Sequence, residues 1–111
     1  MPEHNDRALN LYNLLHYIKI TQERKPSEHN QRNLTSICNR CGLHPTNTGK
    51  PLIIECVTNN LLIERLNEEE GNNYRYYELT KNGIEAHDHL KNLYKLIWSD
   101  KAGRLTEWYD K

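Results

Sequence analysis

The chain has 111 residues, and its 15 lysine and arginine side chains balance its 15 aspartate and glutamate side chains, so the formal net charge at pH 7 is zero. This length fits one domain, and a hydrophobic content of 36% allows only a small core. No run approaches the ~18 apolar residues of a membrane span, and the N-terminus lacks a signal-peptide core. We therefore expect a cytoplasmic protein with no membrane contact.

Apolar residues at helical spacing predict a first helix over residues 6–22. Residues 1–5, which precede it, are expected to form a loose arm. Residues 23–30, which follow it, are polar and without periodicity, and they predict an exposed loop. The residues that carry the helical pattern are Leu11, Leu14, Leu15 and Ile18.

A second and a third helix are predicted on either side of a tight turn at residues 44–48. The second helix should occupy residues 31–40 and end at Gly42, because glycine suits the left-handed conformation that follows many helices. The third helix should run to about residue 60, with Pro51 tolerated only in its first turn. Two residues are candidates for its N-cap, Thr46 and Thr48.

A β-ribbon is predicted after the third helix. Its strands are expected at residues 61–66 and 74–79, joined by a loop at 67–73 that is rich in glycine and asparagine. Two strands alone are marginally stable in water, so the ribbon must pack on the helices.

The last segment predicts a long helix over residues 81–99 with Thr80 as its N-cap. Its apolar residues form two adjacent lines, and one small domain cannot easily cover both. We therefore expect two copies of the chain to associate through this helix. The alternative is that both lines pack on the first helix of the same chain. The first line is Ala86, Leu90, Leu93 and Ile97, and the second is Tyr94 and Trp98.

Helix, tight turn, helix and β-ribbon in this order are the plan of a winged helix-turn-helix. The expected fold is mainly α with a small antiparallel β-ribbon, which is the α+β class. The winged helix-turn-helix domain should occupy residues 1–80, and the C-terminal dimerisation helix and tail should occupy residues 81–111 as part of one continuous structural unit.

Three stretches carry a family resemblance: Leu34-Thr35-Ser36-Ile37 with Gly42-Leu43, then Asn60-Leu61-Leu62-Ile63-Glu64, then Tyr77-Glu78-Leu79-Thr80-Lys81-Asn82-Gly83. They resemble archaeal winged helix-turn-helix DNA-binding proteins with a long C-terminal helix. The resemblance implies a small transcriptional regulator that dimerises through an antiparallel coiled coil of that helix. The chain departs from the family in its longer turn at residues 44–49 and in Asn60-Leu61, which replaces the usual glycine before the strand.

The residues around the turn are suited to contact a DNA duplex. In a helix-turn-helix the N-terminal residues of the second helix enter the major groove, where Asn, Thr and Lys bind base edges or phosphates. Residues 29–54 contain no Asp or Glu, so this edge lacks acidic charge on a charge-balanced chain. The alternative is that short polar residues merely cap and turn the chain here. The expected DNA contacts are Arg32, Arg40, His44, Thr46, Asn47, Thr48 and Lys50.

The ribbon offers a weaker set of contacts. Arg65, Asn73 and Arg75 are candidates for contacts to phosphate or to the minor groove. The carboxylates at residues 68–70 occupy the tip, where phosphates would repel them, so we expect the tip to stay out of the groove.

A metal site is the main alternative use of the turn. Cys38 and Cys41 form a C-x-x-C pair that offers, with His44 and Cys56, four ligands for zinc. No second C-x-x-C pair exists, and Cys38 and Cys41 lie on the apolar face of the second helix. We therefore expect the cysteines to pack in the core and to hold no metal.

The sequence gives no sign of an enzyme or a cofactor. It lacks a phosphate-binding loop, a dinucleotide fingerprint and an H-E-x-x-H sequence. His87 and His89 lie two residues apart on a helix, so they point in opposite directions and cannot share a metal ion.

We expect sequence-selective binding of double-stranded DNA by a homodimer in transcriptional control, and the sequence indicates no small-molecule ligand. One alternative is a protein-interaction adaptor on the same fold, which suits zero net charge and an acidic ribbon tip. The other is a metal- or thiol-responsive regulator on the same fold.

Overall fold

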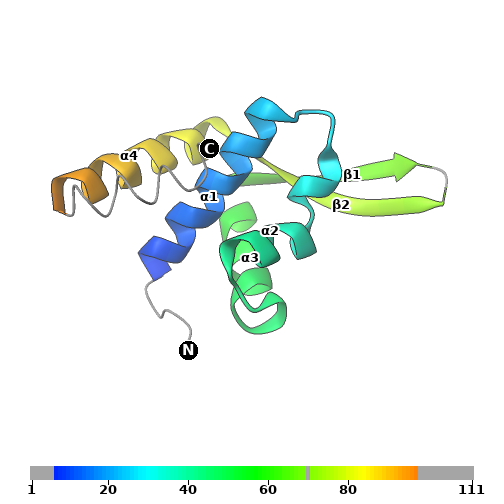
Figure 1. Ribbon diagram of the computed structural model, residues 1–111, viewed down its shortest axis with the longest axis horizontal. Helices are drawn as coiled ribbons and strands as arrows, with labels where there is room; N and C mark the ends of the chain where they lie inside the picture. Colours follow the sequence, from blue (N-terminus) through cyan, green and yellow to red (C-terminus); the bar gives the residue numbers. More distant parts are fainter. Residues whose placement is uncertain (1–6, 70, 98–111) are drawn as a thin grey trace.

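The computed structural model describes residues 7–69 and 71–97, over which four α-helices and one two-stranded antiparallel sheet give a mainly helical α+β fold (Figure 1). The predicted arm at residues 1–5, Trp98 and the predicted tail lie outside the described residues. The elements are α1 (Arg7–Arg24), η1 (His29–Arg32, a 3₁₀ turn), α2 (Leu34–Cys41), η2 (Pro45–Gly49, a π turn), α3 (Lys50–Thr58), β1 (Leu62–Glu69), β2 (Asn72–Leu79) and α4 (Lys81–Ile97).

Helix α1 runs through the middle of the molecule, with α4 beside it and with α2 and α3 beneath it (Figure 1). The hairpin of β1 and β2 extends away from the helices, on the side opposite to the far end of α4. None of the helices in the described ranges is long and apolar enough to cross a bilayer.

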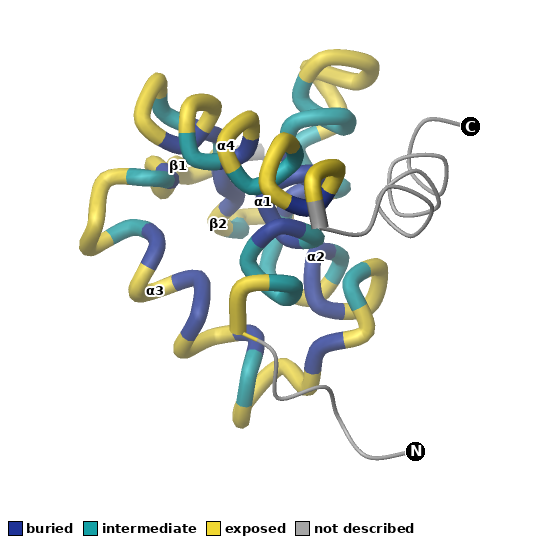
Figure 2. Tube along the Cα trace, turned by 90° about the vertical axis from the view of Figure 1, so that its left-hand side faces the viewer, coloured by how far each residue is buried: buried dark blue, intermediate teal, exposed yellow. Residues whose placement is uncertain are grey.

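The core forms where α1 meets α2, α3 and the base of the hairpin. Leu14, Leu15 and Ile18 of α1 are fully buried, as the helical pattern predicted. Burying such a side chain stabilises the fold by roughly 1.5–3 kcal/mol relative to leaving it exposed. The buried and exposed stretches alternate along α3 in Figure 2, so this helix also has one inward face. The other core members are Tyr17, Ile37, Cys38, Leu43, Leu52, Ile53, Cys56, Leu62, Tyr77 and Leu79.

The fully buried side chain of Arg32 joins the end of α1 to the loop that follows it. Its guanidinium donates to the carbonyl oxygens of Thr21, Lys25 and Pro26 at 3.0–3.2 Å, and its Cζ lies 5.9 Å from the ring centre of Tyr76. A cation at a helix C-terminus binds the last carbonyls favourably. The prediction that Arg32 contacts DNA is wrong, because its guanidinium points into the protein.

Helix α2 starts later than predicted and ends where predicted. The side-chain oxygen of Asn33 accepts from the backbone N–H of Ser36 at 2.8 Å, so α2 starts at Leu34 and η1 precedes it. At the other end Gly42 has a φ of 68°, and the N–H of Leu43 donates to the carbonyl of Cys38 at 2.9 Å. This is the predicted left-handed stop of the helix.

His44, rather than either predicted threonine, caps the start of the next helical segment. Its side chain accepts from the backbone N–H of Asn47 at 3.2 Å, and the π turn η2 then leads into α3 at Lys50. The turn packs tightly on α2: a Cβ on Gly49 would lie 2.2 Å from the Sγ of Cys38. Glycine is therefore required at this position for steric reasons.

Helix α3 ends in a left-handed residue that is not glycine. Asn60 has a φ of 62°, and the N–H of Leu61 donates to the carbonyl of Cys56 at 2.8 Å. Asparagine tolerates this conformation better than most residues. Asn60 thus makes the bend into β1 at the position where the resembled family has glycine.

The hairpin is longer than predicted, and its base is fixed to the helices. Pairing runs from Leu62 opposite Leu79 to Glu69 opposite Asn72, so the predicted loop at residues 67–73 is mostly strand. The polar composition of that stretch suggested a loop. An exposed ribbon, however, needs only its backbone pairing.

Besides the contact of Arg32 with Tyr76, further polar and stacking contacts hold β2 against the rest of the protein. Asn33 forms an isolated antiparallel bridge with Tyr76. The ring of His29 stacks on the ring of Tyr76, with centroids 4.1 Å apart and planes 2° from parallel. The backbone N–H of Leu79 donates to the side-chain oxygen of Gln22 at 2.8 Å. The prediction that the ribbon packs on the helices is confirmed at its base.

Helix α4 begins as predicted. The hydroxyl of Thr80 accepts from the N–H of Gly83 at 3.0 Å, which is an N-cap bond. Gly83 is buried, and a Cβ there would lie 2.1 Å from the carbonyl oxygen of Leu61. The glycine of this junction therefore allows α4 to pass close to the chain that leads into β1.

The predicted dimer seam of α4 faces mostly inward. Ala86 and Leu90 are half-buried against the core, and Tyr94 packs on Tyr12 of α1 with ring centroids 5.6 Å apart. The expectation that Tyr94 lies in a dimer interface is wrong, because it is buried against α1 of the same chain. For the half-buried Ala86 and Leu90 the interface stays a prediction. Of the predicted seam Leu93 stays exposed, while the side chains of Ile97 and Trp98 lie outside the described part of the chain.

Replacement of Arg32 by methionine should destabilise the protein by about 3 kcal/mol, because three buried carbonyl groups lose a charged donor. Urea unfolding at neutral pH measures the loss. Lys25→Met is the control, since Lys25 is exposed in the same loop and should cost less than about 0.5 kcal/mol. Equal effects of the two substitutions would contradict the assigned role of Arg32.

Gly49→Ala should destabilise the protein by about 1–3 kcal/mol, because the new methyl group overlaps the Sγ of Cys38. Cys38→Ala removes that sulfur, so the double variant should be more stable than the sum of the two single effects by about 1 kcal/mol. Chemical unfolding of all four proteins in the cycle gives this coupling. Strict additivity would show that the two side chains do not meet.

Candidate nucleic-acid interface

The turn before α3 presents a row of exposed polar groups. His44, Thr46, Asn47 and Lys50 are exposed, and Thr48 is half-buried. The structure thus brings together the five predicted contacts of the turn on η2 and the first turn of α3. Hydroxyl, amide and ammonium groups of this kind can bind base edges or phosphate oxygens.

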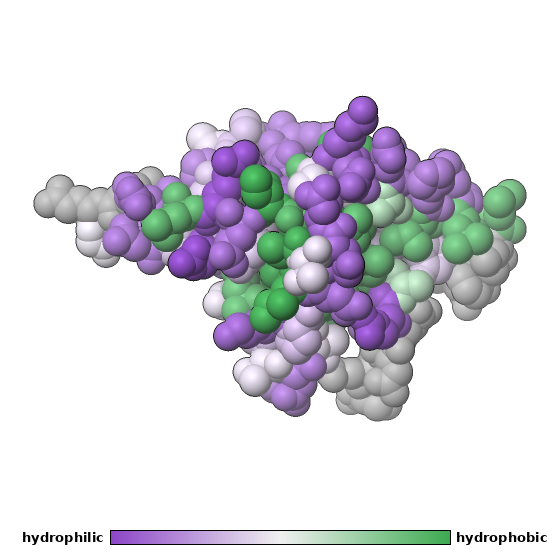
Figure 3. Space-filling model, turned by 180° about the vertical axis from the view of Figure 1, so that it is seen from behind, coloured by the Kyte–Doolittle hydropathy of each residue, from purple (hydrophilic) through white to green (hydrophobic). Residues whose placement is uncertain are grey.

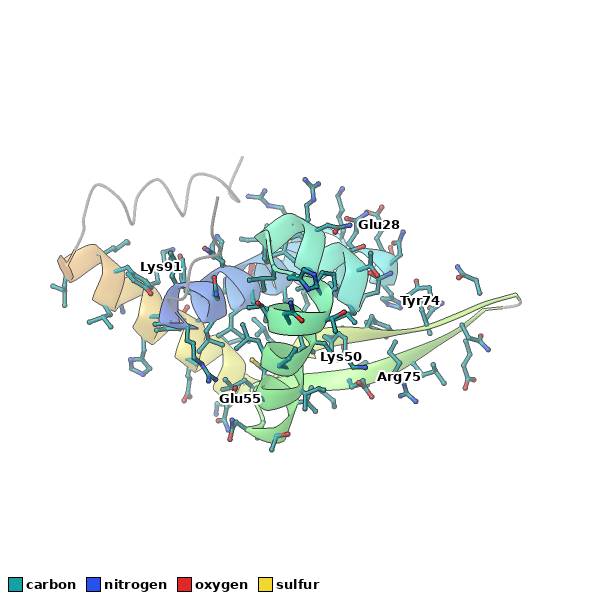
Figure 4. The ribbon with its side chains drawn as sticks, turned by 90° about the horizontal axis from the view of Figure 1, so that it is seen from below. Glu28, Lys50, Glu55, Tyr74, Arg75 and Lys91 are labelled. Atoms are coloured by element: carbon teal, nitrogen blue, oxygen red, sulfur yellow. The ribbon has the colours of Figure 1, made fainter. Side chains whose placement is uncertain are left out.

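The outer face of α3 carries both signs of charge and an exposed apolar residue. Seen from below, Lys50 lies on the side of α3 that faces the hairpin, and Glu55 lies on the opposite side (Figure 4). Glu55 forms an ion pair with Arg7 of α1. Ile54, which directly precedes Glu55 on α3, is 53% exposed. No local pattern in the sequence predicts the Arg7–Glu55 pair, because the two residues lie far apart along the chain.

The two predicted arginine contacts of the hairpin are engaged by carboxylates across the ribbon. Arg65 pairs with Glu78, and Arg75 pairs with Glu64 at 3.1 Å. Since Arg65 is opposite Tyr76 and Arg75 is opposite Leu66, the pleat places the two arginines on opposite faces. At most one of them can face the same way as the outer side of α3.

Figure 4 shows Lys50 pointing from α3 toward the strand that carries Arg75. The same ribbon face holds Glu64, which also accepts from the hydroxyl of Tyr77 at 2.9 Å. Burial, assisted by this hydrogen bond, raises the pKa of Tyr77 to about 12, so the hydroxyl remains a donor. Asn73, the third predicted ribbon contact, is exposed near the tip.

Arg40 is exposed on the last turn of α2. It lies close to the hydroxyl of Tyr17, which donates to the carbonyl of Gln31 at 2.5 Å. Burial raises the pKa of Tyr17, and the positive charge of Arg40 opposes that shift. Of the two arginines predicted to touch the DNA backbone from this region, Arg40 is on the surface and Arg32 is not.

The cysteines pack in the core, as predicted. Cys38 and Cys56 are buried, and burial raises the pKa of both thiols, that of Cys56 to about 12. The half-buried thiol of Cys41 donates to the carbonyl of Asn13. Among the described residues no three His, Cys, Asp or Glu side chains come close enough to hold one metal ion.

Two hollows lie between α1 and α3, and both include Arg7, Leu52 and Glu55 in their walls. Their volumes are about 150 and 200 Å³. Both are smaller than the roughly 300–1,000 Å³ that is typical of small-molecule sites. The exposed edge of η2 and α3 is therefore the better candidate for a functional surface.

Comparison with known proteins found no matching protein-family model, no matching curated protein and no matching solved structure. The resemblance to archaeal winged helix-turn-helix proteins therefore stays a prediction. A function for the surface of η2, α3 and the hairpin has to be argued from its own geometry and chemistry.

Proposed function

We propose that the protein is a winged helix-turn-helix that binds double-stranded DNA, in which α3 reads the major groove and the hairpin is the wing. Transcriptional control is the process that this activity would serve. The observation that carries the proposal is the exposed polar edge of η2 and α3, on a helix whose other end leads into a hairpin fixed to the same helices.

The fixed position of the hairpin supports this proposal. Asn33 caps α2 with its side chain and bridges β2 at Tyr76 with its backbone. Helix α2 and the hairpin therefore share one residue as an anchor. A helix and a ribbon held in one arrangement can contact a groove and the adjacent backbone at the same time.

The chain has no net positive charge, but the arrangement of its charges on α3 and the hairpin is compatible with DNA binding. Lys50 is exposed, and no described carboxylate lies within ion-pair distance of it. Three carboxylates of α3 and the hairpin, Glu55, Glu64 and Glu78, each pair with an arginine. Their charge is partly neutralised, so they repel phosphates less than free carboxylates would.

We also propose that the protein binds DNA as a homodimer that forms through the far end of α4. Leu93 is 48% exposed and Leu96 is 85% exposed on the last turns of this helix. Apolar atoms are visible at that end of the molecule when it is seen from behind (Figure 3). This seam is shifted from the one that the sequence predicted, because Ala86, Leu90 and Tyr94 serve the fold of the single chain.

A protein-interaction adaptor is the second candidate function. The observation that favours it is the exposed side chain of Ile54 on the outer face of α3. An apolar residue at the centre of a contact surface is more typical of protein partners than of a DNA groove. The pairing of both ribbon arginines with carboxylates points the same way.

The double variant Lys50→Glu and Arg40→Glu should lose DNA binding, because two cations at the proposed interface become anions. With a random-sequence duplex pool as probe, its affinity at low salt should fall by at least about 100-fold. The slope of log affinity against log salt should become shallower by about 2 per protomer. Mobility shifts at two salt concentrations measure both quantities.

Arg24→Glu with Lys25→Glu is the matched control, since it makes the same change of charge. These two residues are exposed at the C-terminal end of α1 and directly after it. The control should bind DNA nearly as the unchanged protein does. If the pool is not bound even at low salt, and selection enriches no sequence, DNA binding is excluded. The adaptor function then stands, and Ile54→Glu should disrupt it.

Replacement of both Leu93 and Leu96 by serine should raise the dimer dissociation constant by about 100-fold or more, since four apolar side chains leave the interface. Sedimentation equilibrium measures the constant. The control replaces Ile63 and Leu66, which are 42% and 47% exposed on the hairpin, by serine, and it should dimerise as before. A monomeric unchanged protein would end the dimer proposal without affecting DNA binding.

A further inference from the structure

Two buried histidines meet between α1 and α4. His16 is 2% exposed and His87 is 1% exposed. The Nδ1 of His16 lies 2.7 Å from the Nε2 of His87, and the ring planes are 9° from parallel. Tyr12 lies 5.5 and 5.4 Å from the two rings, centre to centre, and Tyr94 packs on Tyr12. From the sequence alone, a pH-sensitive contact of His87 is expected only weakly and only near the predicted dimer seam, and no local pattern points to His16 as its partner.

The neighbouring carboxylate assigns the hydrogen atoms of the neutral pair. The Oδ1 of Asp88 lies 2.9 Å from the Nδ1 of His87, and a carboxylate can only accept. The Nδ1 of His87 therefore carries hydrogen, which leaves its Nε2 as an acceptor in the neutral ring. The Nδ1 of His16 must then donate. One hydrogen atom lies between the two rings.

The pair tolerates one added proton but not two. If one ring is an imidazolium, one of the facing nitrogens still donates and the other still accepts. If both rings are protonated, the two nitrogens that lie 2.7 Å apart both carry hydrogen, and neither can accept. Two positive charges then also share a buried site. The contact between α1 and α4 then becomes repulsive at this point.

The groups around the pair make protonation unfavourable in the folded protein. Burial lowers the pKa of His87, Asp88 raises it, and the charges of Lys19 on α1 and Lys91 on α4 lower it further. The rings of Tyr12 from α1 and Tyr94 from α4 also face the pair or its flank. Figure 4 shows Lys91 on α4.

We propose that His16 and His87 form a pH-sensitive clasp, which holds α4 on α1 at neutral pH and releases α4 in mild acid. An unfolded or released histidine binds a proton near pH 6.5, whereas the buried ring resists it. Below that pH the released state therefore binds more protons than the folded state, and acid favours release. Because α4 also carries Leu93 and Leu96, release would move the proposed dimer surface. The clasp itself does not depend on DNA binding.

The test compares urea unfolding of the unchanged protein with that of the double variant His16→Gln and His87→Gln, at about pH 7.5 and about pH 5.5. Two glutamines can keep a neutral hydrogen bond without titrating. In the unchanged protein the folding constant should fall by up to ~10-fold per pH unit per histidine below about pH 6.5. The double variant should lose this part of the pH dependence. The control His89→Gln, exposed on the same helix, should behave as the unchanged protein.

An equal acid sensitivity of the double variant and the unchanged protein would overturn the proposal. If the double variant does not fold, the ring signals of the unchanged protein decide the question by nuclear magnetic resonance. His16 and His87 should stay neutral at pH values at which a free imidazole, with a pKa near 6.5, is protonated, and the amide signals of α4 should change when the pair protonates. Protonation of the pair near pH 6.5, as for a free imidazole, with no change in α4, would refute the clasp.

Discussion

The arrangement of the elements depends on the buried guanidinium of Arg32. Removing a cation from water is costly, and here three carbonyl oxygens and the face of Tyr76 offset that cost. The three carbonyls belong to the end of α1 and to the loop that follows it, so one side chain sets where α1 stops and how the chain turns back. Tyr76 belongs to β2. The guanidinium of Arg32 therefore contacts both the end of α1 and strand β2, and it holds them in one arrangement.

The proposed DNA-binding surface depends on that anchor even though Arg32 is not part of it. The residue next to Arg32, Asn33, caps α2 and bridges β2. In α3 the core begins at Leu52, within the first turn of the helix. On the other side, Gly49 lies so close to Cys38 that α2 and the turn before α3 cannot slide past each other. The position of the exposed polar edge relative to the hairpin is thus fixed by buried contacts on both of its sides.

The sequence was sufficient to predict the kind and order of the elements, because periodicity, the left-handed Gly42 and the cap at Thr80 are local signals. It was not sufficient to say what each face packs against. Periodicity placed Tyr94 on an apolar line but not its partner, which lies on α1. Of the candidate site, the exposed turn followed from its polar residues. The burial of Arg32 and the ion pairs of the ribbon depend on contacts between segments that are apart in the sequence, which no local pattern contains.

The two ion pairs that join the strands of the hairpin, Arg65–Glu78 and Glu64–Arg75, also affect whether copies of this protein associate through the ribbon. In the described part of the chain β1 has a strand partner only on its β2 side, so its other edge presents unpaired backbone groups. Such an edge, with Ile63 and Leu66 exposed on it, is a template for strand addition and aggregation. Glu64 and Arg65 stand between these apolar residues, and each is bound to an opposite charge on β2. A second strand that docked here would have to break or bury those charges, so the pairs protect the free edge of the ribbon.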